Sequence, residues 1–153
     1  MKIVVVSDTH GDLSLLRKVA LLNQDATYFY HLGDYEVPTY LLSPFTFVKG
    51  NCDFLSDAPT SLDFTIDYDL KVHLEHGNHI NFLDFENYVK SKNCNIFLYG
   101  HTHKKDARKI KDTFVFNPGS LVKPRDDSFG SYLIINVNQN KNISYEFKSS
   151  KDL

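Results

Sequence analysis

The sequence has 153 residues, a length typical of one domain with a core large enough to be stable unaided. Hydrophobic residues make up 42% and charged residues 24% of the chain, and the formal net charge of -2 gives no electrostatic basis for binding nucleic acid or an anionic membrane. No stretch predicts a membrane span or a signal peptide, and two cysteines without a framework spacing, Cys52 and Cys94, favour a reducing, cytoplasmic setting.

The first half of the chain alternates strand and helix patterns. Residues 3–6 are a continuous β-branched run, which is typical of a strand buried on both faces. Residues 12–24 repeat apolar side chains at helical spacing behind Asp12, which suits an N-cap. Strands are then predicted at residues 27–32 and 45–48, with a short helix or loop at residues 36–42.

The second half is richer in strand patterns. Residues 71–75 alternate between the two faces of a strand, and a helix is predicted from about residue 82 to residue 92. Further strands are predicted at residues 61–67, 95–98, 107–110, 113–116, 132–137 and 143–147. No repeat or linker divides the chain, so the sequence predicts a single α/β domain over residues 1–153, with two sheets.

Five of these strands end in residue types that bind divalent metals, each beside a glycine. Asp8 and His10 stand near Gly11, Asp34 after Gly33, Asn51 after Gly50, His76 before Gly77, and His101 and His103 after Gly100. In an open α/β sheet the site lies outside the carboxyl ends of the strands, so these loops can converge on one spot. Glycine lets the backbone turn sharply and approach a ligand closely. The pattern therefore predicts one metal site built from imidazole, carboxylate and amide groups.

The same residues resemble a known family. Asp8-X-His10, Gly33-Asp34, Gly50-Asn51, His76-Gly77 and Gly100-His101-X-His103 resemble, in order, the five signature motifs of the calcineurin-like metallophosphoesterases. Gly50-Asn51-Cys52-Asp53 and Asn117-Pro118-Gly119-Ser120 are also similar to the small single-domain phosphodiesterases of that superfamily. The resemblance covers residues 3 to about 120 and implies a four-layer αββα fold, in which a two-sheet β-sandwich is flanked by helices.

The resemblance also implies a ligand set and a reaction. By this similarity Asp8, His10 and His103 hold one ion, Asn51, His76 and His101 hold a second, and Asp34 bridges the two. Two cations roughly 3.5–4 Å apart clamp a phosphoryl group, and water caught between them loses a proton near neutral pH, so a bridging hydroxide can act as the nucleophile. Manganese is the expected metal, with Fe, Zn, Ni and Co left open. We expect hydrolysis of a small phosphodiester, with monoesters left open, and the expected catalytic residues are Asp34, Asn51, His76 and Cys52.

Cys52 departs from the pattern of the wider superfamily. Many members carry His directly after the Asn, where it helps to protonate the leaving group, whereas the narrower subfamily also has Cys there. A thiol beside two cations should be pushed toward the thiolate, with no proton to give. This departure favours substrates whose leaving group departs well without a proton.

Several residues and two other classes of function stay open. His31 and His73 are expected to be packing or surface residues, and His79 can serve either a helix start or the orientation of substrate. Lys123 and Arg125 can contact a substrate phosphate or simply lie on an exposed basic loop. One alternative is a protein-interaction module on the same fold, as in the retromer subunit that lacks part of the metal set, and the other is a nuclease. The complete ligand set argues against the first and the lack of a basic stripe against the second, while homo-oligomerisation is left open.

Overall fold

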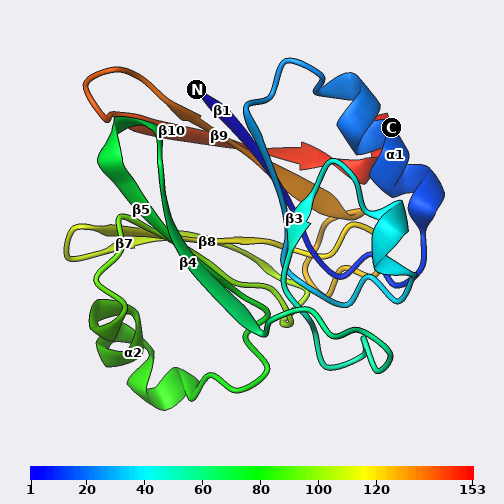
Figure 1. The fold of residues 1–153 in the computed structure, drawn as a ribbon, viewed down its shortest axis with the longest axis horizontal. Helices are drawn as coiled ribbons and strands as arrows, with labels where there is room; N and C mark the ends of the chain where they lie inside the picture. Colours follow the sequence, from blue (N-terminus) through cyan, green and yellow to red (C-terminus); the bar gives the residue numbers. More distant parts are fainter.

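The two outer faces of a β-sandwich are each covered by one helix in this protein, whose computed structural model describes residues 1–153 (Figure 1). The layers run from α1 through a first five-stranded sheet and a second five-stranded sheet to α2. Helix α1 spans Leu13–Leu22 and α2 spans Phe85–Ser91. The predicted four-layer αββα fold is therefore confirmed.

The first sheet has the strand order β10-β9-β1-β2-β3. Its strands are β1 (Lys2–Val6), β2 (Tyr28–His31), β3 (Thr46–Phe47), β9 (Ser131–Val137) and β10 (Ile143–Ser149). Strand β1 lies at the centre, parallel to β2 and antiparallel to β9, so that Val5 pairs with Tyr30 on one side and Leu133 on the other. This central position explains the continuous β-branched run, because both faces of β1 are buried.

The second sheet has the strand order β4-β5-β6-β8-β7. Its strands are β4 (Ser61–Ile66), β5 (Leu70–Glu75), β6 (Ile96–Leu98), β7 (Lys105–Ile110) and β8 (Thr113–Pro118). Strand β7 starts at Lys105 rather than at residue 107, because Lys105 and Asp106 pair with β8 although their polar side chains lie at a sheet edge. Strand β3 is shorter than the predicted strand at residues 45–48, because it pairs only with Tyr30 and His31.

The two α-helices are shorter than the sequence predicts. Asp12 caps α1 as expected, since its Oδ1 accepts a hydrogen bond from the backbone N–H of Leu15 at 3.0 Å, and Asn23 ends the helix by donating to Ala20 and Val19. Residues 82–92 do not form one helix. A 3₁₀ turn at Phe82–Asp84 precedes α2, because the Asn81 side chain caps the N–H of Leu83. Other 3₁₀ turns lie at Thr39–Leu41, Asp67–Asp69 and Ser150–Asp152.

Three clusters of buried side chains hold the layers together. The largest lies between the two sheets and includes Val5, Leu74 and Leu98. A second joins α1 to the first sheet, and a third joins α2 to the second sheet. None of the helices is long and apolar enough to cross a lipid bilayer. The loops that follow β1, β2, β3, β5 and β6 emerge from this frame and carry the predicted metal ligands.

Candidate metal centre

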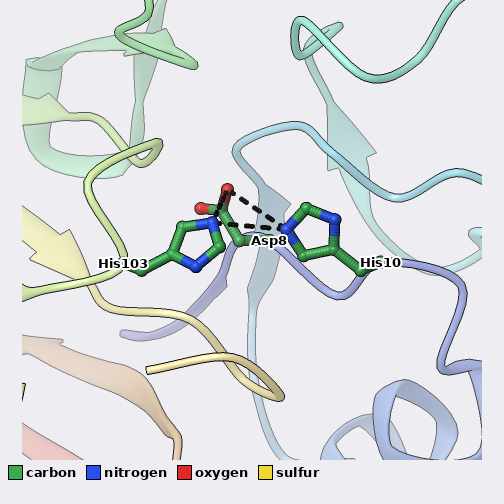
Figure 2. A group of neighbouring side chains, drawn as sticks. All are labelled: Asp8, His10 and His103. Atoms are coloured by element: carbon green, nitrogen blue, oxygen red, sulfur yellow. Dashed lines mark hydrogen bonds and ion pairs between the residues drawn. The ribbon is translucent and has the colours of Figure 1, made fainter. Parts of the chain in front are cut away.

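One group of three side chains joins the loop after β1 to the loop after β6. Figure 2 shows Asp8, His10 and His103 pointing toward one another. His103 Nε2 lies 3.1 Å from Asp8 Oδ1 and 3.3 Å from His10 Nε2, and His10 Nε2 lies 3.9 Å from Asp8 Oδ1. Residues that are more than 90 positions apart in the chain thus direct their donor atoms to one point.

A second group joins the loops after β2, β3, β5 and β6. His76 Nε2 lies 3.2 Å from Asp34 Oδ2 and 3.2 Å from His101 Nδ1. The Oδ1 atom of Asn51 lies 3.0 Å from His76 Nε2 and 3.1 Å from His101 Nδ1. The two groups adjoin, because His76 Nε2 is also 3.9 Å from Asp8 Oδ1. The structure therefore brings together all seven side chains that the sequence predicts as metal ligands.

The backbone at this site is held in an uncommon conformation. Left-handed φ angles occur at Asp8 (55°), His10 (41°), Asp34 (56°), His101 (68°) and His103 (59°). Residues other than glycine rarely adopt this region, and such conformations persist only where the surrounding structure imposes them. Five residues with left-handed φ angles lie in the loops of this site, which indicates that the surrounding structure imposes the orientation of their side chains.

Two of the motif glycines are required by close approach of the loops. A Cβ atom on Gly50 would lie 2.2 Å from Asp34 Oδ1 and 2.3 Å from the Asp34 backbone nitrogen. A Cβ atom on Gly100 would lie 2.1 Å from Ser7 Oγ and 3.0 Å from Asp8 Oδ2. The glycines thus let neighbouring loops pack directly against the two carboxylates, as the sequence pattern predicts.

Hydrogen bonds on the far side of three imidazoles set their orientation. His76 Nδ1 donates to the Leu32 carbonyl at 2.7 Å, and His103 Nδ1 donates to the Lys123 carbonyl at 2.6 Å. His10 Nδ1 makes the corresponding bond to the carboxylate of Glu36. An acceptor at Nδ1 fixes the proton on that atom. The lone pair of Nε2 then faces the other side chains of the candidate metal centre, which is the usual arrangement of metal-binding histidine.

The residues fit divalent cations, and the clearest sign is an orphaned carboxylate oxygen. Asp8 is fully buried, and its Oδ1 has no hydrogen-bond partner, whereas its Oδ2 accepts from Ser7 Oγ at 2.5 Å and from the His101 N–H at 3.1 Å. A buried acceptor without a partner is costly, and here it faces three imidazole nitrogens. A cation held by Asp8, His10 and His103 would satisfy this oxygen, and the N/O donor set suits Mn, Fe, Zn, Co or Ni.

The pKa shifts show the same attraction for positive charge. Burial alone would raise the pKa of Asp34, but the hydrogen bond and charge of His76 outweigh burial and lower this pKa to about 2. Burial likewise opposes the net effect at His76, whose pKa is raised by Asp34 and Asp8. The pKa of His103 is raised mainly by Asp8. The carboxylates of Asp8 and Asp34 thus favour positive charge at this point of the structure.

Asp53 organises the loops although the sequence analysis assigned it no role. Its buried carboxylate accepts hydrogen bonds from the backbone N–H groups of Asp34 at 2.7 Å, Gly50 at 2.8 Å and Glu36 at 2.8 Å. It thereby ties the loop after β2 to the loop after β3. Its place in the Gly-Asn-Cys-Asp motif is the only sequence signal, and that signal does not reveal which groups it binds.

Cys52 lies at the edge of the second group. Its backbone N–H donates to Asp34 Oδ1 at 2.8 Å, and Asn51 Nδ2 donates to its Sγ at 3.6 Å. Burial, followed by the charge of Asp34, raises the pKa of the Cys52 thiol to about 11. In the metal-free protein the thiol therefore keeps its proton, and the expected shift toward thiolate depends on the charge of bound cations.

The remaining histidines lie outside the two groups. His31 is buried and bonded to Thr9 Oγ1 at 2.8 Å, and its burial lowers its pKa to about 3, so the ring is neutral. His73 is buried between Asp63 and Glu75, at 2.8 Å and 2.7 Å. Both are packing residues, as predicted, whereas His79 is exposed beside the neighbouring Asn78 side chain.

The end of β8 and the segment that follows it border the site. Asn117 Nδ2 donates to the Gly100 carbonyl at 2.9 Å, and Ser120 Oγ donates to the Asp8 carbonyl at 2.8 Å. Lys123 reaches the site through its backbone carbonyl, and the N–H of Arg125 donates to the His103 carbonyl at 2.9 Å. These bonds support the loops that carry Asp8, His101 and His103.

Comparison with known proteins identifies the family of this architecture. Residues 1–140 match the calcineurin-like phosphoesterase superfamily domain. The chain is 28% identical over 145 residues to the probable metallophosphoesterase YsnB of Bacillus subtilis, covering 90% of this chain and 85% of that protein. It is 28% identical over 142 residues to the phosphodiesterase MJ0936 of Methanocaldococcus jannaschii, covering 78% of this chain and 83% of that protein.

Solved structures share the fold. A protein from Streptococcus pneumoniae TIGR4, described as a predicted phosphoesterase, superposes with a TM-score of 0.87 at 26% identity, covering 98% of this chain and 90% of the other. Vps29 from Entamoeba histolytica, solved with Zn²⁺, superposes with a TM-score of 0.73 at 17% identity, covering 98% of this chain and 99% of the other. At that lower identity the likeness to Vps29 extends to the fold alone.

Proposed function

The chain belongs to the calcineurin-like phosphoesterase superfamily and is a metal-dependent phosphoesterase, and on this premise we propose that it hydrolyses phosphodiesters with a pair of divalent ions. The observation that carries the proposal is the orphaned Oδ1 of Asp8, which lies among imidazole nitrogens whose protons are held on the opposite side of each ring. A site of this kind directs several electron pairs at one small volume, which is the arrangement that binds divalent cations.

Each residue has a defined task in this proposal. Asp8, His10 and His103 would hold the first ion, Asn51, His76 and His101 the second, and Asp34 would contact both. When bound, the ions supply Lewis acidity toward the phosphoryl group and a hydroxide nucleophile near neutral pH. The chain itself keeps the donors in place through the Leu32 and Lys123 carbonyls and through the N–H of Cys52, so little reorganisation is needed as charge develops.

The direct test is hydrolysis of bis-p-nitrophenyl phosphate by the protein reconstituted with Mn²⁺. We expect turnover that is lost with a chelator and restored by metal, and a higher kcat/KM on this diester than on simple alkyl phosphate monoesters. The reason is that p-nitrophenolate departs without a proton, and Cys52 stands where many members of the superfamily carry the His that protonates the leaving group. Equal or higher kcat/KM on alkyl monoesters would contradict the assignment as a phosphodiesterase.

Replacing Cys52 by His should change activity selectively. A positioned general acid is typically worth about 10²–10⁴ in rate, so Cys52→His should accelerate hydrolysis of alkyl phosphate esters and leave p-nitrophenyl esters nearly unchanged. The gain can fall short of that range, because a new imidazole is not oriented by the pocket and can capture a metal. Values of kcat for both kinds of ester, with metal content measured in each variant, decide this prediction. A uniform change at equal metal occupancy would show that position 52 does not limit departure of the leaving group.

The alternative is a protein-interaction module without catalysis, and the shared fold with Vps29 is the observation in its favour. The full set of donor residues supports the enzyme instead, because a docking surface has no need of an unsatisfied buried carboxylate oxygen. Failure of the metal-loaded protein to cleave any phosphate ester would favour the interaction module.

We further propose manganese as the metal, from the mixed N/O donors, and the cytoplasm as the location, from two free thiols.

A further inference from the structure

A cavity of about 480 Å³ opens beside the metal centre, between the loop after β2 and the loop after β3. It shares Glu36 and Cys52 with the edge of that centre, since Glu36 is bonded to His10 and the N–H of Cys52 donates to Asp34. This volume is that of a site for a small organic group. A substrate phosphate at the metal centre would thus have a ready-made space for one of its ester groups.

The chemistry of the cavity walls selects an apolar group. Half of the twelve lining residues are hydrophobic, and among them Tyr40 and Phe54 are 80% and 82% exposed to solvent. No Lys, Arg or His lines the cavity, whereas Glu36, Asp53 and Asp57 do. Phosphate and carboxylate groups are recognised by cationic side chains, so this lining excludes polyphosphates and other anions.

The walls are fixed relative to each other. The Asp53 carboxylate joins the two loops through the N–H groups of Asp34 and Glu36, and the Tyr35 hydroxyl is hydrogen-bonded to Ser56 of the other loop. These bonds engage Glu36, Asp53 and Tyr35 with partners inside the protein, so the part of the lining left for a bound group is mainly apolar. A lining that is apolar and aromatic suits an aryl ester group better than an alkyl one, and aryl alcohols also depart without a proton far more readily than alkyl alcohols do.

We propose that this cavity is the leaving-group subsite and that it takes an uncharged aromatic alcohol, esterified as an aryl phosphodiester. The proposal rests on the phosphodiesterase function argued above. Hydrolysis breaks the P–O bond to the aryl oxygen, forms a P–O bond to the oxygen of water and releases the phenolate, while the proton of the water passes to solvent. Phe54 and Tyr40 are positioned to pack against the aromatic ring of the leaving group.

Two diesters that release the same phenol identify which ester group occupies the cavity. Methyl p-nitrophenyl phosphate and phenyl p-nitrophenyl phosphate differ only in the group that is retained. If the cavity holds the leaving group, Phe54→Ala raises KM for both diesters by the same factor, on the order of fivefold from the loss of one aromatic contact. The matched control is Phe129→Ala, which removes a ring that is 71% exposed and does not line the cavity, and it should leave KM unchanged for both. A rise confined to the phenyl ester would overturn the leaving-group assignment.

A binding measurement separates the subsite from catalysis. In saturation-transfer NMR on the full chain, p-cresol should bind the wild-type protein and the Phe129→Ala variant, and it should lose its signal with Phe54→Ala. The anionic p-hydroxybenzoate should give no signal, because the cavity has an acidic rim and no cation. Binding of p-cresol without turnover of either diester would keep the subsite and reject the phosphodiesterase. No effect of Phe54→Ala on KM or on p-cresol binding would overturn the subsite, and would be the result expected if another protein covers this surface.

Discussion

Replacing Asp34 by Asn should reduce kcat/KM on bis-p-nitrophenyl phosphate more than any other carboxylate-to-amide exchange in the chain, by on the order of 10²–10³. The exchange keeps the shape of the side chain but removes the negative charge that both ions would share. Asp34 Oδ1 already accepts the N–H of Cys52, and Oδ2 faces His76, so the amide would direct an N–H₂ group at one of these partners. The loss of charge and the loss of an acceptor act in the same direction.

The measurement is steady-state kinetics across a series of metal concentrations. The matched control is Asp112→Asn, which makes the same exchange at an exposed residue between β7 and β8 and should keep wild-type activity. Asp34→Asn with near-wild-type turnover at saturating metal would exclude a bridging role for this residue.

Replacing Gly50 by Ala should damage the metal centre and the stability of the fold together. The new Cβ would lie 2.2 Å from Asp34 Oδ1 and 2.3 Å from the Asp34 backbone nitrogen, so the backbone of one loop has to move. Overpacking of this kind typically lowers the free energy of unfolding by about 1–3 kcal/mol. The displaced group is the Asp34 carboxylate, which is proposed to contact both ions. We therefore expect metal affinity and activity to fall together with stability.

Gly11→Ala provides the comparison. Gly11 has a φ of 85°, yet a Cβ on it would meet nothing within 4 Å. This variant should therefore show backbone strain of about 1–2 kcal/mol without crowding of Asp34. Urea unfolding gives the change in stability, and metal titration gives the change in affinity. If Gly50→Ala retained wild-type metal affinity, the close approach of the two loops would not be what positions Asp34.

The residues gathered at the candidate metal centre are predictable from the sequence because each stands in the loop that follows a strand pattern. Strand ends such as Val6 and His31 fix where the following loop begins, and the topology of parallel strands brings these loops to one edge. The groups that orient the ligands are not predictable in this way. The carbonyls of Leu32 and Lys123 are backbone groups, so no residue type marks them in the sequence.

The errors in the secondary structure have related causes. Residues 82–92 carry a helical pattern, but the side chain of Asn81 stabilises a tighter first turn that periodicity does not reveal. Strand β7 starts before the apolar alternation does, because its first residues pair only through the backbone. Local patterns therefore predict which elements form, and long-range pairing decides where they begin and end.

The number of divalent ions bound per chain tests the central claim most directly. After removal of metal and reconstitution with Mn²⁺, elemental analysis of the dialysed protein should give about two ions per chain, because the seven donors form two adjoining groups. A variant such as His103→Ala should lose one of these ions and His76→Ala the other. Two ions in the wild type and about one in each variant is the predicted result, whereas a single tight ion in the wild type, or none, would contradict the binuclear centre.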